Sequence, residues 1–334
     1  MPGLIHASGT GRRSGKVNQT VSVGGKIPHL TVDEIESPPL SLSQLTWRRF
    51  RRHKMAIFGT VVIFLLVLYV FVGSTFFSQE YANHNDPRLG LTAPSTSHPF
   101  GTDPTGRDVL ARSIYAGQIS LLIGLIAALI ETSVGVVIGA VAGYYGGWID
   151  AVLMRITEAM LTIPEIVLLI VMAKEFAGKF PSVNLLGREF SGSVVVIVII
   201  IGLTSWMYLA RIVRAEFLSI KESDFILAAR STGTSNFGII FRHILPNSIA
   251  PIIVSATLGI ANAILAEAYV SFFGLGVQPP TATWGNMLDG ANNYLDTAPW
   301  LWFFPGILIL FTVLSINFLG DGLRDALDPH SRAV

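Results

Sequence analysis

Four glutamates lie inside or beside long apolar stretches of the chain: Glu131, Glu158, Glu165 and Glu267. Because a charged side chain is costly in hydrocarbon, each must face another helix, a water-filled path or the membrane interface. A carboxylate in such a place can contact a permeating solute. It can equally be protonated or hydrogen-bonded between helices. The sequence by itself favours none of the four as a solute contact.

Motifs for catalysis or metal binding are absent from the sequence. The chain has no Cys, which excludes disulfides, thiolate metal sites and Cys nucleophiles. It also lacks the phosphate loop of ATP-binding proteins, the His-Glu-x-x-His helix of metalloproteases and the Gly-x-Ser-x-Gly elbow of serine hydrolases. We therefore expect no catalytic residue, no cofactor site and no metal site, and any ATP hydrolysis must take place in another protein.

The elements that must position the glutamates are apolar runs long enough to cross a bilayer, which takes about 20 residues. Of the 334 residues, 51% are hydrophobic and 13% are charged, whereas about a quarter are charged in an ordinary soluble domain. We predict an all-α polytopic membrane protein with six transmembrane helices. The expected spans cover residues 55–77, 119–144, 156–173, 193–209, 249–273 and 300–319.

Lys and Arg residues predict the orientation of these spans, since loops rich in them stay on the cytoplasmic side. With the N-terminus inside, 17 of the 23 basic residues fall on inner segments and 6 on outer segments. We therefore expect both termini in the cytoplasm. The opposite topology fits the charges less well.

The segments between the spans differ in composition. Residues 1–40 are rich in Gly, Ser, Thr and Pro and predict a disordered cytoplasmic tail. Residues 41–54 predict an interfacial helix, and residues 78–118 an extracytoplasmic loop that ends in a weakly amphipathic helix. The permease core is expected over 119–320, with a cytoplasmic loop at 211–247 and a cytoplasmic tail at 321–334.

Small or polar residues recur every three to four positions in three of the expected spans. The second span carries glycines at 135, 139, 143 and 147, a spacing that lets another helix approach closely. The third places Arg155, Glu158, Thr162 and Glu165 on one side of a helix, with Pro164 perturbing it locally. The fifth carries Ser255, Gly259, Ala263, Glu267 and Ser271. We expect these faces to pack inside the bundle around a path that admits water.

The expected loop at 211–247 is too long for a simple connection and contains a helix of its own. Ser223 or Asp224 can cap its start, Ala228 and Ala229 give it a smooth surface, and Gly233 can end it in a left-handed conformation. A second segment, ending at Leu245 and Pro246, leads into the fifth span.

This loop resembles the Glu-Ala-Ala loop of ATP-binding-cassette (ABC) importer permeases. The matching positions are Leu227, Ala228, Ala229, Gly233, His243, Leu245 and Pro246. Two of them depart from the commonest pattern, because Leu227 stands where Glu is usual and His243 where Ile is usual. The first departure removes the carboxylate that would make a salt bridge to the ATPase.

Three other stretches resemble one branch of that family, the peptide and nickel importer permeases of the dipeptide or oligopeptide C-subunit type. They are GTDPTGRDVL at 101–110, GLGVQPPTATW at 274–284 and GDGLRDALDP at 320–329. The resemblance covers roughly residues 45–329, and its four motifs occur in the family's order.

The resemblance implies a type I importer permease fold in a bacterial or archaeal plasma (inner) membrane. It implies as partners a second, similar permease, two cytoplasmic ATPases that bind ATP and Mg²⁺, and an extracytoplasmic solute-binding protein. Within the family the short loop helix docks on the ATPase and couples ATP binding to the switch of the pore. Peptides are the first expectation for the solute, with nickel and glutathione as others.

An ion-gradient-driven carrier is the alternative from another class, because intramembrane carboxylates suit proton relays. We find no convincing internal repeat of the kind such carriers often contain. The two hypotheses differ in whether transport requires ATP and partner subunits or an ion gradient alone.

Overall fold

The structure is a computed structural model, and it describes residues 41–328 apart from 177, 186 and 187. Contacts divide the chain into two units, Met1–Ser41 and Leu42–Val334, and the description below concerns the second. The tail expected at 1–40 and the last residues of the tail expected at 321–334 lie outside the described residues.

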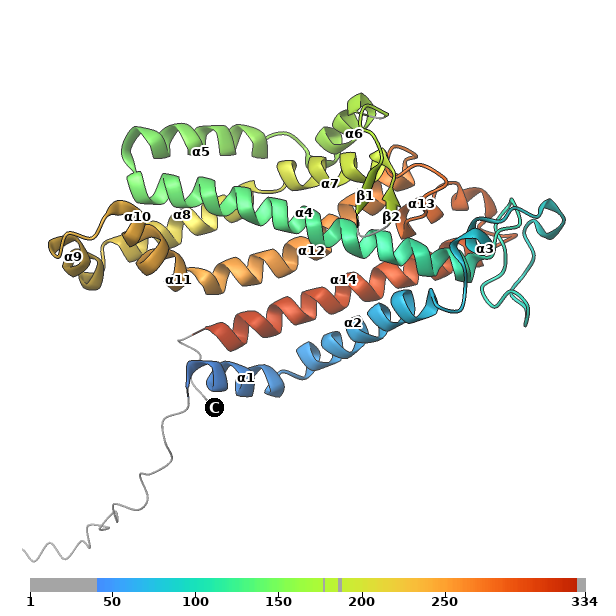
Figure 1. The fold of residues 1–334 in the computed structure, drawn as a ribbon, viewed down its shortest axis with the longest axis horizontal. Coiled ribbons are helices and arrows are strands. Elements are labelled where there is room, and N and C mark those ends of the chain that lie inside the picture. The colour runs from blue at the N-terminus through green and yellow to red at the C-terminus, as the bar shows by residue number, and fades with distance from the viewer. Residues whose placement is uncertain (1–40, 177, 186–187, 329–334) are drawn as a thin grey trace, which may run out of the picture. The chain divides into compact units, whose positions relative to one another are not determined.

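Four helices are long and apolar enough to cross a membrane: α2 (Lys54–Gly73), α4 (Val109–Tyr145), α12 (Ile249–Phe272) and α14 (Trp300–Leu327) (Figure 1). Two bent helix pairs supply the remaining candidates. The first is α5 (Gly147–Leu161) with α6 (Glu165–Phe176), bent by 86°, and the second is α7 (Gly192–Thr204) with α8 (Met207–Lys221), bent by 40°. If each pair is one span, the described residues hold six, so a helical polytopic protein is confirmed.

Shorter elements lie at the two ends of these helices (Figure 1). At one end, called the α9 end below, are α9 (Asp224–Ser231), α10 (Asn236–Gly238), the π-helical turn η3 (Ile239–Ile244) and α11 (Leu245–Asn247). At the other, called the loop end, are α3 (Gln79–Asn83), η2 (Pro87–Leu89), α13 (Trp284–Met287) and η4 (Ala291–Tyr294). Helix α1 (Leu42–Arg52) occupies the stretch of the expected interfacial helix.

One short hairpin departs from the all-α expectation. Strands β1 (Val183–Leu185) and β2 (Arg188–Phe190) pair antiparallel, with Val183 opposite Phe190. The hairpin joins α6 to α7 at the loop end (Figure 1).

The structure corrects several expected boundaries. The amphipathic helix expected before residue 119 is not separate but forms the first part of α4, where Val109 and Ile114 are buried. Helix α8 continues to Lys221, so much of the loop expected at 211–247 is helical. Helix α14 continues to Leu327, into the segment expected as a tail. Apolar periodicity marks the hydrocarbon-facing length of a helix, whereas its hydrogen-bonded backbone continues beyond that length.

The third expected span is not one continuous helix. Helix α5 ends at Leu161 and α6 begins at Glu165, with Pro164 between them and an angle of 86°. The expectation that Arg155, Glu158, Thr162 and Glu165 share one helical face is therefore wrong for Glu165, which begins α6. Arg155 and Glu158 do pair on one face of α5. A proline lacks the N–H that would continue the helix, and its ring clashes with the preceding turn.

Glycines set the distance between the long helices. A Cβ on Gly139 of α4 would lie 2.5 Å from the carbonyl oxygen of Ala210 in α8, and one on Gly143 would lie 2.6 Å from the Cβ of Phe217. The close approach expected for this stripe is therefore present between α4 and α8. Gly147 does not belong to it, because nothing lies within 4 Å of its Cβ position.

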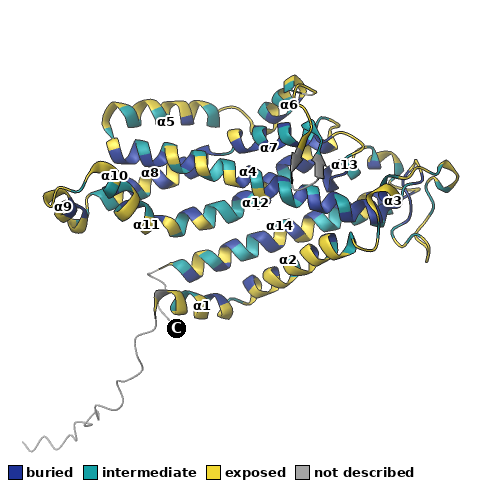
Figure 2. Ribbon diagram, viewed as in Figure 1, coloured by how far each residue is buried: buried dark blue, intermediate teal, exposed yellow. Residues whose placement is uncertain are grey.

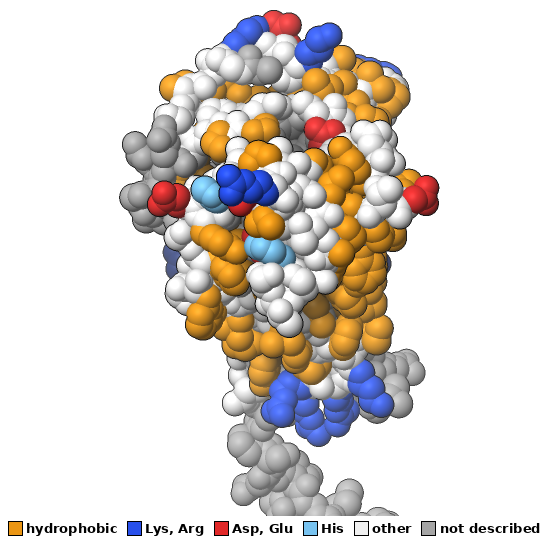
Figure 3. Space-filling model, turned by 90° about the vertical axis from the view of Figure 1, so that its right-hand side faces the viewer, with side chains coloured by type: hydrophobic (Ala, Val, Ile, Leu, Met, Phe, Trp, Pro, Cys, Tyr) orange, Lys and Arg blue, Asp and Glu red, His pale blue; other side chains and the backbone are white. Residues whose placement is uncertain are grey.

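Large apolar side chains are exposed on several helices. Figure 2 shows how many residues of α2 and α5 are exposed. On α2, Phe58, Phe64 and Phe71 are each about half exposed, although the helix has no charged residue after Lys54. A soluble protein rarely exposes so continuous an apolar surface, whereas lipid covers it without cost. Figure 3 views the loop end, where hydrophobic side chains run along the flank and charged ones lie on the loop face.

Candidate functional site

Helix α9 is anchored to the bundle on one side and free on the other. Ile226 is fully buried and Ala229 is 9% exposed, and Ile226 packs in one cluster with Val213 and Phe217 of α8. Leu227 is 48% exposed, and Ala228 is exposed as well. The expectation that both alanines form the outer surface is therefore half right, since Ala229 faces inward.

Gly233 ends this segment in the expected left-handed conformation. Its φ is +80°, its N–H donates to the carbonyl of Arg230, and the N–H of Thr234 donates to the carbonyl of Ala229. These bonds satisfy carbonyls that the end of the helix leaves without an intrahelical partner. A positive φ of this size is a conformation that glycine adopts at little cost.

The segment that connects α9 to α12, formed by α10, η3 and α11, packs beside α9. Ile244 of η3 is fully buried, and Leu245 packs beside it against the cluster around Ile226. The side chain of Asn247 donates to the carbonyl of His243 at 2.6 Å. Pro246 lies in the first turn of α11, where the missing N–H costs no hydrogen bond.

Aromatic and basic side chains lie beside α9. Phe237 is 70% exposed, and the centroid of its ring lies 4.3 Å from the ring centroid of Phe241. Arg230 is placed over the ring of Tyr144, with its guanidinium carbon 5.9 Å from the centroid. The α9 end therefore offers an apolar surface with cationic side chains, which is the composition of a protein-docking site.

Two cations connect this end to the long helices. Arg214 of α8 makes a bidentate ion pair with Asp150 of α5. Its Nε donates to Oδ1, and its Nη2 donates to Oδ2 at 2.6 Å. Lys221, at the end of α8, donates to the carbonyls of Gly143 and Tyr144 at 3.2 and 3.4 Å. These contacts therefore join α8, against which Ile226 of α9 packs, to α5 and α4.

Glu131 and Glu165 face one cavity of about 460 Å³ between α4, α6, α8 and α12. Glu165 is exposed, and its Oε1 accepts a hydrogen bond from Ser205 at 3.0 Å. The Oε2 of Glu131 lies 2.9 Å from the position of a Cβ on Gly259. Ser255 and Asn262 also line this cavity, which we call the mid-bundle cavity.

The other two glutamates lie elsewhere. Glu267 is 1% exposed; its Oε1 accepts from Ser271 at 2.6 Å and its Oε2 from Ser120 at 3.4 Å. Glu158 is exposed on α5, where its Oε2 lies 3.3 Å from Nη1 of Arg155. Two of the four glutamates thus share a cavity, one is sealed between helices and one is on the surface.

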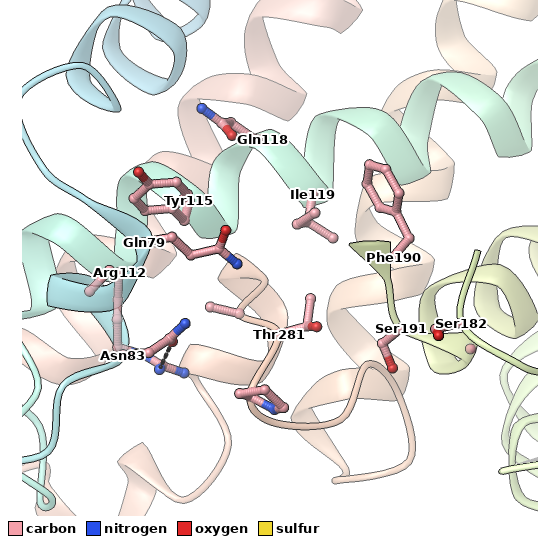
Figure 4. Close-up of a pocket in the computed structure, with 14 residues that line it drawn as sticks. Gln79, Asn83, Arg112, Tyr115, Gln118, Ile119, Ser182, Phe190, Ser191 and Thr281 are labelled. Carbon is pink, nitrogen blue, oxygen red and sulfur yellow. Dashed lines mark hydrogen bonds between the residues drawn. The ribbon is translucent and has the colours of Figure 1, made fainter. Parts of the chain in front are cut away.

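A second cavity, of about 590 Å³, opens at the loop end and was not expected from the sequence (Figure 4). We call it the loop-end cavity. Helices α3 and α4, the hairpin and the segment before α13 form its wall. Arg112 of α4 lines it and donates to Oδ1 of Asn83 at 3.2 Å. The available signal was a single cation close after the GTDPTGRDVL motif, at the start of a long apolar helix.

No group of three or more His, Cys, Asp or Glu side chains in the described part of the chain could hold a metal ion. The loop-end motifs instead make structural contacts. Trp284 is fully buried, its ring N–H donates to the carbonyl of Ser113 at 2.8 Å, and its backbone N–H donates to Ser120 at 3.1 Å. This part of the GLGVQPPTATW motif therefore holds α13 against α4.

Comparisons with known proteins agree with this architecture. Residues 135–333 match the family model described as binding-protein-dependent transport system inner membrane component. Residues 41–94 match the N-terminal TM domain of oligopeptide transport permease C.

Three relatives illustrate the similarity. A putative peptide permease protein of Brucella suis is 42% identical over 85% of this chain and 89% of its own length. The dipeptide transport system permease protein DppC of Alkalihalophilus pseudofirmus is 39% identical over 91% of this chain and 97% of its own. The oligopeptide transport system permease protein OppC of Haemophilus influenzae is 36% identical over 90% and 93%.

The family model covers more than half of the chain, and the relatives are similar along nearly all of it. The importer permease fold and the inner-membrane location implied by the resemblance are thereby confirmed. The chain belongs to the family of inner membrane components of binding-protein-dependent transport systems, as a permease of an ABC importer.

Proposed function

We propose that this ABC importer permease carries di- and oligopeptides into the cell. The proposal is supported by the relatives, whose names specify peptide, dipeptide or oligopeptide transport. A pathway with both acidic and basic groups suits a solute that carries an ammonium and a carboxylate. Nickel or glutathione would be the cargo of the same kind of importer, and no group of described residues favours a metal cargo.

Helix α9 is the coupling helix in this proposal. The observation that supports this role is that one face of the helix is packed against the bundle while the other is exposed. Ile226 and Ala229 hold the helix to the bundle, while Leu227 and Ala228 remain exposed for the ATPase. Because Leu227 is apolar, the contact at this position is hydrophobic instead of an ion pair. Gly233, His243, Leu245 and Pro246 shape and support the surface.

The proposed assembly contains a second homologous permease, two ATP-binding subunits and a solute-binding protein. The partner ATPases bind ATP and Mg²⁺ and carry out the hydrolysis. The α9 end lies on the cytoplasmic side, together with both termini, and the loop end faces the binding protein. Closure of the ATPases moves α9, and the ion pair of Arg214 with Asp150 transmits this movement to α5.

The mid-bundle cavity is the proposed part of the solute path on this chain. Its carboxylates, Glu131 and Glu165, can receive the ammonium group of a peptide. Glu267 has a packing role, because its two hydrogen-bonding serines and its burial separate it from the cavity. Glu158 lies on the surface and has no role in the path. Membership of a binding-protein-dependent family favours ATP over an ion gradient as the energy source.

Gly233→Val tests the coupling assignment. A branched side chain at φ +80° is strained, so the end of α9 should shift, and peptide uptake should fall by roughly a hundredfold with normal insertion into the membrane. Gly233→Asn is the matched control, because Asn tolerates the left-handed region and should retain most uptake. Radiolabelled dipeptide uptake and co-purification of the ATPases would be measured. Normal uptake by the Val variant would rule out α9 as the coupling element.

A further inference from the structure

Arg112 is a buried cation whose hydrogen-bonding capacity is mostly unused. Its side chain is 5% exposed. In the described part of the chain, its guanidinium makes one hydrogen bond, to Oδ1 of Asn83 at 3.2 Å. A guanidinium has five N–H donors, and a buried charge without partners is costly. The remaining donors therefore call for an acceptor that enters from outside.

Two carboxylates that precede Arg112 in the sequence, Asp103 and Asp108, have other partners. Asp103 accepts from the side chain and the backbone N–H of Arg107, at 2.6 and 3.1 Å. Asp108 caps the start of α4 and bonds to Nδ1 of His98 at 2.8 Å. Neither forms an ion pair with Arg112 among the described residues. Arg112 also lines a smaller cavity together with Asp103 and Asp289, and among the described residues it forms an ion pair with neither.

The wall of the loop-end cavity suits an anion. Gln79 and Thr281 line it with an amide and a hydroxyl, and Arg112 supplies a positive charge (Figure 4). The hydroxyl of Tyr115, which also lines it, donates to the carbonyl of Phe77 at 2.7 Å. No Asp or Glu occurs among the described residues that line it. Its volume of about 590 Å³ lies in the range of cavities that take small solutes.

We propose that the loop-end cavity binds the terminal carboxylate of a peptide, with the Arg112 guanidinium as the receiving group. The planar guanidinium matches the two oxygens of a carboxylate. An acidic side chain of the binding protein has the same chemistry, but the burial of Arg112 within a cavity favours a small solute. The inference rests on the proposed function and adds a recognition site for the carboxyl end of the cargo.

The test compares a dipeptide with its C-terminal amide in cells that express the complete transporter. Arg112→Gln should lower uptake of the free acid by about tenfold or more, since a hydrogen bond to a charged group is lost. It should change uptake of the amide by less than about twofold, because the amide has no carboxylate for the guanidinium to bind. Arg88→Gln, an exposed arginine at the same end, is the control and should leave both rates unchanged.

Two further variants separate carboxylate binding from a structural role. Asn83→Ala removes the observed hydrogen bond and keeps the charge, so the preference for the free acid should persist. Arg112→Lys keeps the charge without the planar fork and should give an intermediate loss. Equal loss of acid and amide in Arg112→Gln, reproduced by Asn83→Ala, would make Arg112 a structural residue and overturn the proposal.

A direct measurement covers the case in which the binding protein rejects the amide. A photo-reactive benzophenone side chain at position 79 should capture radiolabelled dipeptide in the otherwise unchanged complex, and Arg112→Gln should abolish the capture. Undiminished capture would overturn the proposal, as would capture of the binding protein in place of the dipeptide. If the unchanged transporter takes up no peptide, the proposed function itself fails, which is a different outcome.

Discussion

Glu131 and Glu267 lie in similar sequence settings and in very different structural ones. Each stands on a long apolar helix, four residues from a small side chain. Glu131 lines the mid-bundle cavity, whereas Glu267 is sealed between Ser120 and Ser271 beside α13. The difference shows that a carboxylate within a span indicates a polar neighbour, and that only the packing around it tells whether that neighbour is protein or solute.

The closely packed region should be the more sensitive to a change of volume. Gly139→Leu would place a side chain against the backbone of Ala210, at a contact that cannot yield without moving α8. We expect destabilisation by about 3 kcal/mol or more, and little protein in the membrane. Gly306→Leu is the control, because its Cβ position on α14 has no neighbour within 4 Å. Thermal unfolding in detergent measures the stability of both variants. Equal stability of Gly139→Leu and Gly306→Leu would refute the close contact between α4 and α8.

Loss of the sealed carboxylate should reduce stability and uptake together. Glu267→Leu leaves Ser120 and Ser271 without their acceptor, at a cost of about 1–3 kcal/mol. Glu267→Gln keeps an acceptor oxygen and should lose less than half as much. Unfolding temperature and membrane abundance are the measurements. A stable Leu variant with altered peptide selectivity would instead move Glu267 into the solute path.

Loss of the Glu131 carboxylate should reduce peptide uptake without reducing stability, in contrast to loss of Glu267. Glu131→Gln removes a charge beside a cavity and should change stability by no more than about 0.5 kcal/mol. Uptake of peptides with a free amino group should fall by roughly tenfold, as expected for loss of a charge-assisted hydrogen bond. N-acetylated peptides should be affected less. If Glu131→Gln lowers stability as much as Glu267→Leu, the contrast between the two glutamates fails.

Apolar runs predict where the straight spans lie, although not always where their helices begin and end, and they predict the broken spans poorly. The fifth span was expected over residues 249–273, and α12 covers Ile249–Phe272. The third was expected as one helix, although Pro164 lies inside it and the chain turns by 86° there. A proline in an apolar run can kink a helix or end it, and the choice depends on what packs on either side. The hairpin between β1 and β2 has no strong local pattern and was missed.

Some features of the candidate site could likewise be predicted from local sequence, whereas others could not. The end of α9 follows from local chemistry, since Gly233 provides the left-handed stop. The helix starts at Asp224 as expected, but Ser223 before it makes no side-chain capping hydrogen bond. The inward direction of Ala229 and the shared cavity of Glu131 and Glu165 depend on helices far apart in the sequence. Arg112 carried no signal beyond its charge, because its significance comes from a cavity wall that four separate segments build.

The sequence by itself determined that this chain is a helical membrane protein, and its motifs indicated an importer permease. Those properties depend on composition, on apolar length and on short-range spacing, which the chain carries locally. Tertiary structure alone decided which glutamates are sealed, where Arg112 lies and which side of α9 is free. These outcomes depend on contacts between helices that are distant in the sequence, such as the close approach of α4 and α8 at Gly139 and Gly143.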